Sequence, residues 1–146
     1  MTHLYTRGCE YALRALQAMA AHPDESVTVV ELCTIAQVPE PFTRKMLQQL
    51  VRAGMLKSVR GPGGGFRFAK DPAEVSLMEV VTIIENGTRI DRCVLGSKDC
   101  DDTSPCPLHY QWAPIKHAAN QMLETKTIQD LTIAAKPRKK RKKSKR

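Results

Sequence analysis

Residues 38–70, VPEPFTRKMLQQLVRAGMLKSVRGPGGGFRFAK, decide the fold. After a turn with two prolines, apolar residues recur at helical spacing as far as Gly54, which predicts a helix that ends there. Its predicted inner face consists of Phe42, Met46, Leu47, Leu50 and Val51. Its predicted outer face is polar and basic, and consists of Thr43, Arg44, Lys45, Gln48 and Arg52. The segments MLKSVR and FRFAK then predict two short strands around the loop GPGGG.

The residues before this stretch predict two further helices. An apolar stripe over residues 6–21 predicts the first, and Thr28 is a candidate N-cap for a short second helix. Apolar positions of this second helix include Val29, Leu32, Cys33 and Ala36. Two helices joined by a tight turn and followed by a hairpin form a winged helix. We therefore predict a winged helix-turn-helix DNA-binding domain over residues 1–72.

The rest of the chain predicts an assembly region. Ser76 and Glu79 have capping-box spacing, which predicts a linking helix within residues 73–90. A cysteine-rich cluster loop over 91–109 is followed by a dimerisation helix and a C-terminal element over 106–133. The composition of residues 134–146 predicts a disordered basic tail. The expected fold class is mainly α with a small β-hairpin, a winged helix-turn-helix plus a long dimerisation helix.

The predicted long helix carries one continuous apolar seam. Its members are separated by 4, 3, 4 and 3 residues: Leu108, Trp112, Ile115, Ala119 and Met122. Such spacing needs a partner helix, which favours a homodimer, although packing against the chain's own domain is the alternative. Pro114 lies within the pattern, where it removes a hydrogen bond and can kink the helix.

Positive charge gathers in two segments of a chain with a net charge of +8. Residues 40–70 carry seven basic residues and one acidic residue, and residues 136–146 carry nine basic residues and no acid. A solvated surface is one explanation, but a basic winged helix favours double-stranded DNA as the partner. The candidate DNA-binding residues are Thr43, Arg44, Lys45 and Gln48 on the helix and Arg60, Gly63, Gly64 and Arg67 on the wing. The glycine loop lacks the GK[ST] continuation of a nucleotide phosphate cradle.

Other cellular settings are disfavoured. No run of about 18 apolar residues exists to span a membrane. The first residues lack the pattern of a signal peptide. We therefore expect a cytoplasmic protein, in which cysteines are reduced, metal-bound or redox-active rather than joined in structural disulfides.

Three of the five cysteines lie in one loop, with the spacing Cys93-x6-Cys100-x5-Cys106-x2-His109. Thiolates bind zinc and iron–sulfur clusters. Structural zinc usually uses cysteine pairs spaced by two to four residues, so the longer spacings suit a wider group such as a two-iron cluster. Zinc, a redox dithiol and inert thiols remain alternatives, and Cys33 is expected in the core. An enzyme with Cys106 as nucleophile beside His109 lacks an orienting third group, so we do not expect an enzyme.

These features together resemble the Rrf2 family of bacterial winged-helix regulators, which includes IscR-like and NsrR-like members. The resemblance covers residues 4–132 and rests on EYALRAL, on VPEPFTRKMLQQLVRAGMLKSVRGPGGGF, on SLMEVV and on the three-cysteine loop. It implies a homodimer that binds palindromic promoter DNA.

The resemblance also implies a cofactor and its ligands. Cys93, Cys100 and Cys106 match the thiolates that hold an iron–sulfur cluster, and [2Fe–2S] is favoured over [4Fe–4S]. His109 matches the fourth ligand of IscR-like members, whereas Glu10 matches the acidic ligand that the partner subunit supplies in NsrR-like members. The implied function is transcription regulation in response to iron, redox state or nitric oxide. A cluster-free regulator of this family and a zinc-stabilised DNA-binding protein are the alternatives.

Overall fold

The computed structural model describes residues 4–87, 91–96 and 99–133. The predicted basic tail, 134–146, and the end of the predicted linking helix, 88–90, lie outside the described residues. Within the described ranges, no helix combines the length and apolarity needed to cross a bilayer.

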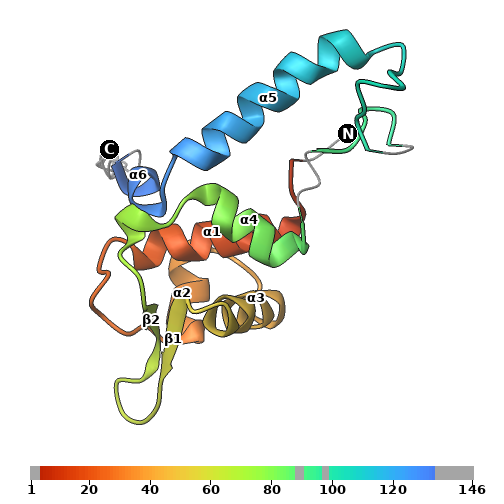
Figure 1. Cartoon of the computed structure of the whole chain (residues 1–146). Helices are drawn as coiled ribbons and strands as arrows, with labels where there is room; N and C mark the ends of the chain where they lie inside the picture. Colours follow the sequence, from red (N-terminus) through yellow and green to blue (C-terminus); the bar gives the residue numbers. More distant parts are fainter. Residues whose placement is uncertain (1–3, 88–90, 97–98, 134–146) are drawn as a thin grey trace, which may run out of the picture.

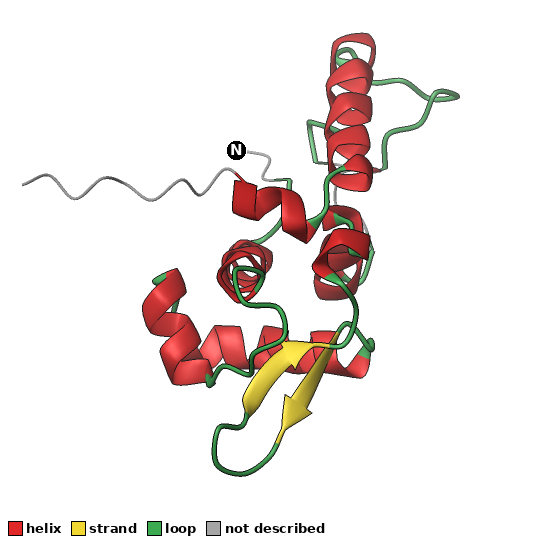
Figure 2. Cartoon of the chain, turned by 90° about the vertical axis from the view of Figure 1, so that its left-hand side faces the viewer, coloured by secondary structure: helices red, strands yellow, loops and turns green. Residues whose placement is uncertain are grey.

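Three helices and a hairpin form the N-terminal part of the molecule (Figure 1). They are α1 (Arg7–Met19), α2 (Val29–Ala36), α3 (Glu40–Arg52), β1 (Leu56–Val59) and β2 (Gly65–Phe68). The strands pair antiparallel, and Val27 adds an isolated bridge to Phe66. Figure 2 shows the hairpin projecting below the helices as a wing. The predicted fold class, mainly α with a small β-hairpin in a winged helix-turn-helix, is confirmed.

Local sequence signals set the helix ends. Thr28 caps α2 and Ser76 caps α4 (Leu77–Glu85), each in a complete capping box with the glutamate three residues later. A short 3-10 helix, η1 (Pro72–Glu74), joins the wing to α4. Buried side chains of α1, α2, α3 and α4 form one core, in which Cys33 lies as predicted.

The predicted faces of α3 are wrong at two positions, Phe42 and Thr43. Leu47 and Leu50 are buried as predicted, and the other residues of the predicted outer face are exposed. Phe42 is exposed, whereas Thr43 is fully buried and its Oγ1 donates a hydrogen bond of 2.8 Å to the Pro39 carbonyl. Pro39 is the N-cap, so the inward stripe runs through Thr43, Leu47 and Leu50. Thr43 therefore cannot reach a base edge, and its predicted role in DNA recognition is withdrawn.

The long helix α5 (His109–Thr125) extends away from the winged helix, and α6 (Ile128–Ile133) returns to it (Figure 1). Leu123 and Ile128 are buried in the core, and the Ile128 N–H donates to the Val75 carbonyl at 2.9 Å. These contacts fix the C-terminal end of α5 to the body. The helix begins at His109 rather than within 106–108, so Leu108 is its N-cap residue, and Pro114 lies inside it.

Candidate functional site

The cysteine loop is folded by backbone hydrogen bonds between its two arms. Arg92 and Asp99 form an isolated antiparallel bridge, and the Cys100 N–H donates to the Asp91 carbonyl at 2.7 Å. The His109 N–H donates to the Cys106 carbonyl at 3.0 Å, which closes a turn at the start of α5. These bonds bring Cys93, Cys100, Cys106 and His109 around one small cavity of about 10 Å³.

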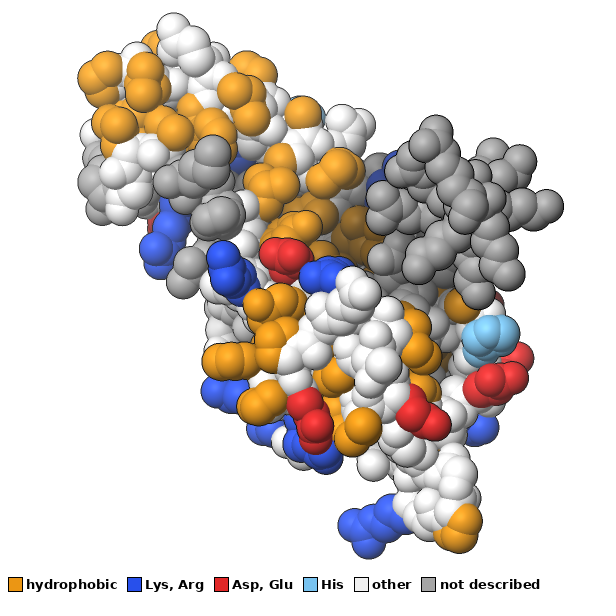
Figure 3. Space-filling model, turned by 180° about the vertical axis from the view of Figure 1, so that it is seen from behind, with side chains coloured by type: hydrophobic (Ala, Val, Ile, Leu, Met, Phe, Trp, Pro, Cys, Tyr) orange, Lys and Arg blue, Asp and Glu red, His pale blue; other side chains and the backbone are white. Residues whose placement is uncertain are grey.

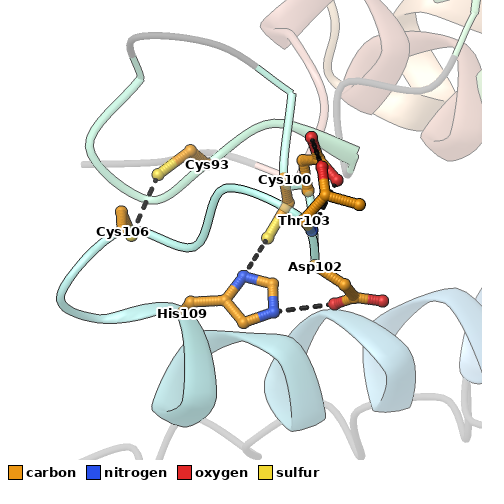
Figure 4. A network of polar contacts seen from close by, with 7 residues as sticks. Cys93, Cys100, Asp102, Thr103, Cys106 and His109 are labelled. Carbon is orange, nitrogen blue, oxygen red and sulfur yellow. Dashed lines mark hydrogen bonds and ion pairs between the residues drawn. The ribbon is translucent and has the colours of Figure 1, made fainter.

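The four candidate ligands form two pairs (Figure 4). The Sγ atoms of Cys93 and Cys106 lie 3.3 Å apart, and Cys100 Sγ lies 3.3 Å from Nδ1 of His109. Cys93 is buried and Cys106 and Cys100 are half-buried. Within the described ranges, no three His, Cys, Asp or Glu side chains are arranged as ligands of one metal ion. The arrangement is therefore two donor pairs rather than one tetrahedral set.

A carboxylate orients the imidazole of this site. His109 is only 5% exposed, and its Nε2 lies 2.8 Å from Oδ1 of Asp102. A carboxylate accepts hydrogen bonds, so Nε2 is the donor to Asp102, and Nδ1 faces Cys100. Asp101 folds the turn beside it by accepting from the backbone N–H and the hydroxyl of Thr103. Sequence reasoning missed Asp102, because one aspartate among several in a polar loop carries no periodic signal.

The loop is also attached to α5. The indole Nε1–H of Trp112 donates a hydrogen bond of 3.1 Å to the Arg92 carbonyl. Arg92 immediately precedes Cys93, so displacement of the loop changes a contact of the helix.

Two other candidate groups lie outside this cavity. Glu10 is on the exposed side of α1, where it pairs with Arg14 at 3.9 Å, and it does not line the cavity of the cysteines. Cys9 is fully buried, and burial, assisted by the negative charge of Glu85, raises the pKa of its thiol to about 12. Cys9 is therefore a protonated core residue at neutral pH.

The basic surface comprises the exposed side of α3 and the wing. Arg44, Lys45 and Gln48 are exposed, and Arg44 Nη2 donates a 2.7 Å hydrogen bond to Glu40 one turn earlier. Arg60 is exposed on the wing, while Arg67 is half-buried opposite Lys57 and its buried Nε has no hydrogen-bond partner among the described residues. Six of the seven remaining predicted DNA contacts, these five side chains and Gly63 of the wing loop, are thus exposed to solvent at least in part.

The remaining predicted contact, Gly64, is explained by packing. A Cβ at Gly64 would lie 2.4 Å from the Val59 carbonyl oxygen. At Gly65, which has a φ of +139°, a Cβ would lie 2.1 Å from the carbonyl oxygen of Val27. Gly64 is required by the close approach of the wing's own backbone and Gly65 by that of Val27 before α2, whereas the space around Gly63 is open.

Comparison with known proteins assigns the family. The family model described as "Rrf2: Iron-dependent Transcriptional regulator" matches residues 5–134. The chain belongs to the Rrf2 family. It is 29% identical over 130 residues to a putative HTH-type transcriptional regulator of Aquifex aeolicus (strain VF5), covering 88% of this chain and 90% of that protein. It is 26% identical over 122 residues to the HTH-type transcriptional regulator IscR of Serratia proteamaculans (strain 568), covering 83% and 72%.

Solved structures agree on the fold of this Rrf2 protein. CymR, the global cysteine regulator of B. subtilis, superposes with a TM-score of 0.72 at 18% identity, over 92% of this chain and 98% of CymR. The family match makes the protein a transcriptional regulator with DNA as its partner, and not an enzyme. The thiol beside His109 belongs to Cys100 rather than to Cys106, and Asp102 supplies an orienting carboxylate that the sequence did not predict.

Proposed function

We propose that this Rrf2 regulator acts as a homodimer that holds a [2Fe–2S] cluster on Cys93, Cys100, Cys106 and His109, and that the cluster controls its affinity for promoter DNA. The observation that carries the proposal is the convergence of three thiols and one oriented imidazole in a single loop. When bound, the cluster would supply a centre that responds to iron supply, oxidation or nitric oxide.

The donor set fits a two-iron cluster better than a single ion. Each iron of such a cluster takes two protein ligands, and the loop presents two pairs. Two thiolates on one tetrahedral metal with bonds of about 2.3 Å are separated by roughly 3.8 Å, close to the 3.3 Å between Cys93 and Cys106. The pairing therefore assigns Cys93 with Cys106 to one iron, and Cys100 with His109 to the other.

The cavity between the donors, about 10 Å³, is large enough for roughly one water-sized group. The loop must therefore widen to bind a cluster. Since Trp112 holds the Arg92 carbonyl, this widening is coupled to α5. A change in α5 in turn alters the separation of two recognition helices in a dimer, which is the quantity that half-site spacing on DNA selects.

His109 is favoured over Glu10 as fourth ligand. The hydrogen bond from Nε2 to Asp102 leaves Nδ1 as the coordinating nitrogen, the arrangement by which a carboxylate orients a ligating histidine. We assign Asp102 the role of a positioning residue. Glu10 belongs to another surface of the same chain, so it could contribute only from a partner subunit.

The dimer is proposed to form through α5. Hydrophobic side chains gather along α5 on the face shown in Figure 3. Leu108, Ile115 and Met122 are exposed in the single chain, whereas Trp112 and Ala119 are half-buried, so internal packing leaves much of the predicted seam uncovered.

In DNA binding we assign base reading to Arg44, Lys45 and Gln48 on α3, and backbone contacts to Arg60 and Arg67 on the wing. The tail, residues 136–146, would add affinity for any DNA sequence. Its nine basic residues would displace counterions from DNA phosphates, which are the same in every sequence. Deleting the tail should weaken binding to specific and random duplexes alike and flatten the salt dependence.

Alanine substitution of each loop cysteine tests the proposal. Cys93→Ala, Cys100→Ala and Cys106→Ala should each lose iron and visible absorbance, because a thiolate ligand is removed, while the winged helix stays folded. Cys33→Ala is the matched control, since its thiol lies in the core, and it should keep the cluster. Full iron content in any loop variant, or loss of iron in Cys33→Ala with the fold intact, would contradict the ligand set.

A further inference from the structure

The pairing of the loop thiols also specifies how they oxidise. We propose that Cys93 and Cys106 form an intramolecular disulfide when the cluster-free protein meets a peroxide, and that Cys100 is left out of it. The two Sγ atoms are 3.3 Å apart and are not joined by a disulfide. They must approach by roughly 1.3 Å to reach the ~2.05 Å of a disulfide bond. Cys93 and Cys106 are thus the two thiols already in contact.

Cys100 is withheld by a different partner. Its Sγ faces Nδ1 of His109 at 3.3 Å, and this imidazole is buried and held from its other nitrogen by Asp102. The Cys100 N–H is also bonded to the Asp91 carbonyl, on the opposite arm of the loop. Pairing Cys100 with either other thiol would break the contact with His109, whereas pairing Cys93 with Cys106 leaves it intact.

Exposure gives an order to the two chemical steps. Cys106 is half-buried and Cys93 is buried, so the peroxide meets Cys106 first. The sulfur of Cys106 attacks one peroxide oxygen, the O–O bond breaks, and sulfenic acid and one water form. The sulfur of Cys93 then attacks the sulfenic sulfur, loses its proton, and expels the hydroxyl group as a second water. In total two thiols and one hydrogen peroxide give one disulfide and two waters.

The product would cross-link the start of the loop to the residue three positions before α5. The disulfide itself does not depend on a cluster. Its consequence for the cluster rests on the proposed function, because two sulfurs joined in a disulfide cannot be iron ligands. The oxidised protein should therefore not bind iron until a thiol reductant restores the two thiols.

Peptide mapping tests the pairing in the full-length protein. The chain is stripped with a chelator, reduced, freed of reductant and treated with one equivalent of hydrogen peroxide. Trypsin and a protease that cleaves before aspartate then separate the three thiols into peptides 93–98, 99–100 and 102–116. We expect peptide 93–98 joined to 102–116, with the mass of the pair lower by two hydrogens. The cross-link should persist in Cys100→Ser and disappear in Cys93→Ser and in Cys106→Ser.

Other products would overturn the inference. A dominant cross-link to peptide 99–100 would show that Cys100, the thiol beside His109, takes part in the disulfide. Sulfinic acids without any intramolecular cross-link, or disulfides only between chains, would equally exclude the proposed pair. Circular dichroism of each variant shows whether a negative result comes from unfolding, and Cys33→Ser serves as a matched control that should oxidise as wild type does. If the protein binds iron but does not form this disulfide, the proposed disulfide is refuted and the proposed cluster is not, because iron content is measured separately.

Discussion

Replacing Ile115 with aspartate should dissociate the dimer without unfolding the chain. Ile115 is 58% exposed in the single chain, so its substitution removes little internal packing. In a dimer with two-fold symmetry the same side chain is buried twice. Burying a whole isoleucine stabilises by about 1.5–3 kcal/mol, so burying the exposed part stabilises by roughly 0.9–1.7 kcal/mol per chain and about 2–3.5 kcal/mol per dimer.

That free energy corresponds to a dissociation constant about 30- to 300-fold higher. An aspartate adds the cost of desolvating a charge against an apolar seam, so this range is a lower bound. Sedimentation equilibrium at several micromolar concentrations measures the dissociation constant directly. Circular dichroism and the unfolding midpoint of the variant report whether the chain itself stays folded.

Val30→Asp is the matched control. Val30 is 57% exposed, the same as Ile115 within a percentage point, but it lies on α2. Its substitution should leave the dimer intact. Unchanged association of Ile115→Asp, or dissociation of Val30→Asp, would refute the assignment of the seam to the dimer interface.

Three further predictions follow from buried and exposed groups. The pKa of Cys9 in the folded protein, about 12, lies above that of an unfolded thiol, so the protonated thiol stabilises the fold fully below pH ~8.5 and this stabilisation is lost as pH rises toward 12. Urea unfolding between pH 8 and 11 should therefore show a falling free energy of unfolding, and Cys9→Ala should lessen that fall. Thr43→Val should lower the free energy of unfolding by about 0.5–1.5 kcal/mol without changing DNA site preference, because the Pro39 carbonyl keeps its bond from the Thr43 N–H. Arg44→Ala should weaken specific binding by about 1–3 kcal/mol and relax that preference; binding titrations with specific and random duplexes distinguish the two. His109→Ala should change the visible and electron paramagnetic resonance spectra more than Glu10→Ala does, and the reverse ranking would move the fourth ligand to the partner subunit.

Local signals in the sequence were sufficient for most of the architecture. The Ser76–Glu79 capping box starts α4 where the spacing predicts it, and the glycine-rich loop lies between two paired strands. Such signals involve neighbours in the chain, whose geometry is fixed by backbone bonding. The core position of Cys33 could likewise be predicted from helical periodicity.

The features that could not be predicted depend on which residue of the first turn of a helix faces inward and on contacts between residues distant in sequence. In the first turn of α3 the buried residue is Thr43 rather than the apolar Phe42, because the Thr43 hydroxyl donates to the Pro39 carbonyl, and an apolar pattern does not reveal such a bond. Spacing identified the four candidate ligands but not their pairing, which depends on contacts between residues 9 and 13 positions apart in the loop. The same holds for Gly65, whose Cβ position is filled by Val27, a residue distant in sequence.

The iron and acid-labile sulfide content of anaerobically purified protein is the most direct test of whether the chain holds a [2Fe–2S] cluster. A [2Fe–2S] cluster requires about two iron and two sulfide ions per chain, with visible absorbance that bleaches when the iron is removed. We expect the wild-type protein to show this stoichiometry. A protein prepared in the same way that holds zinc alone, or no metal, would contradict it.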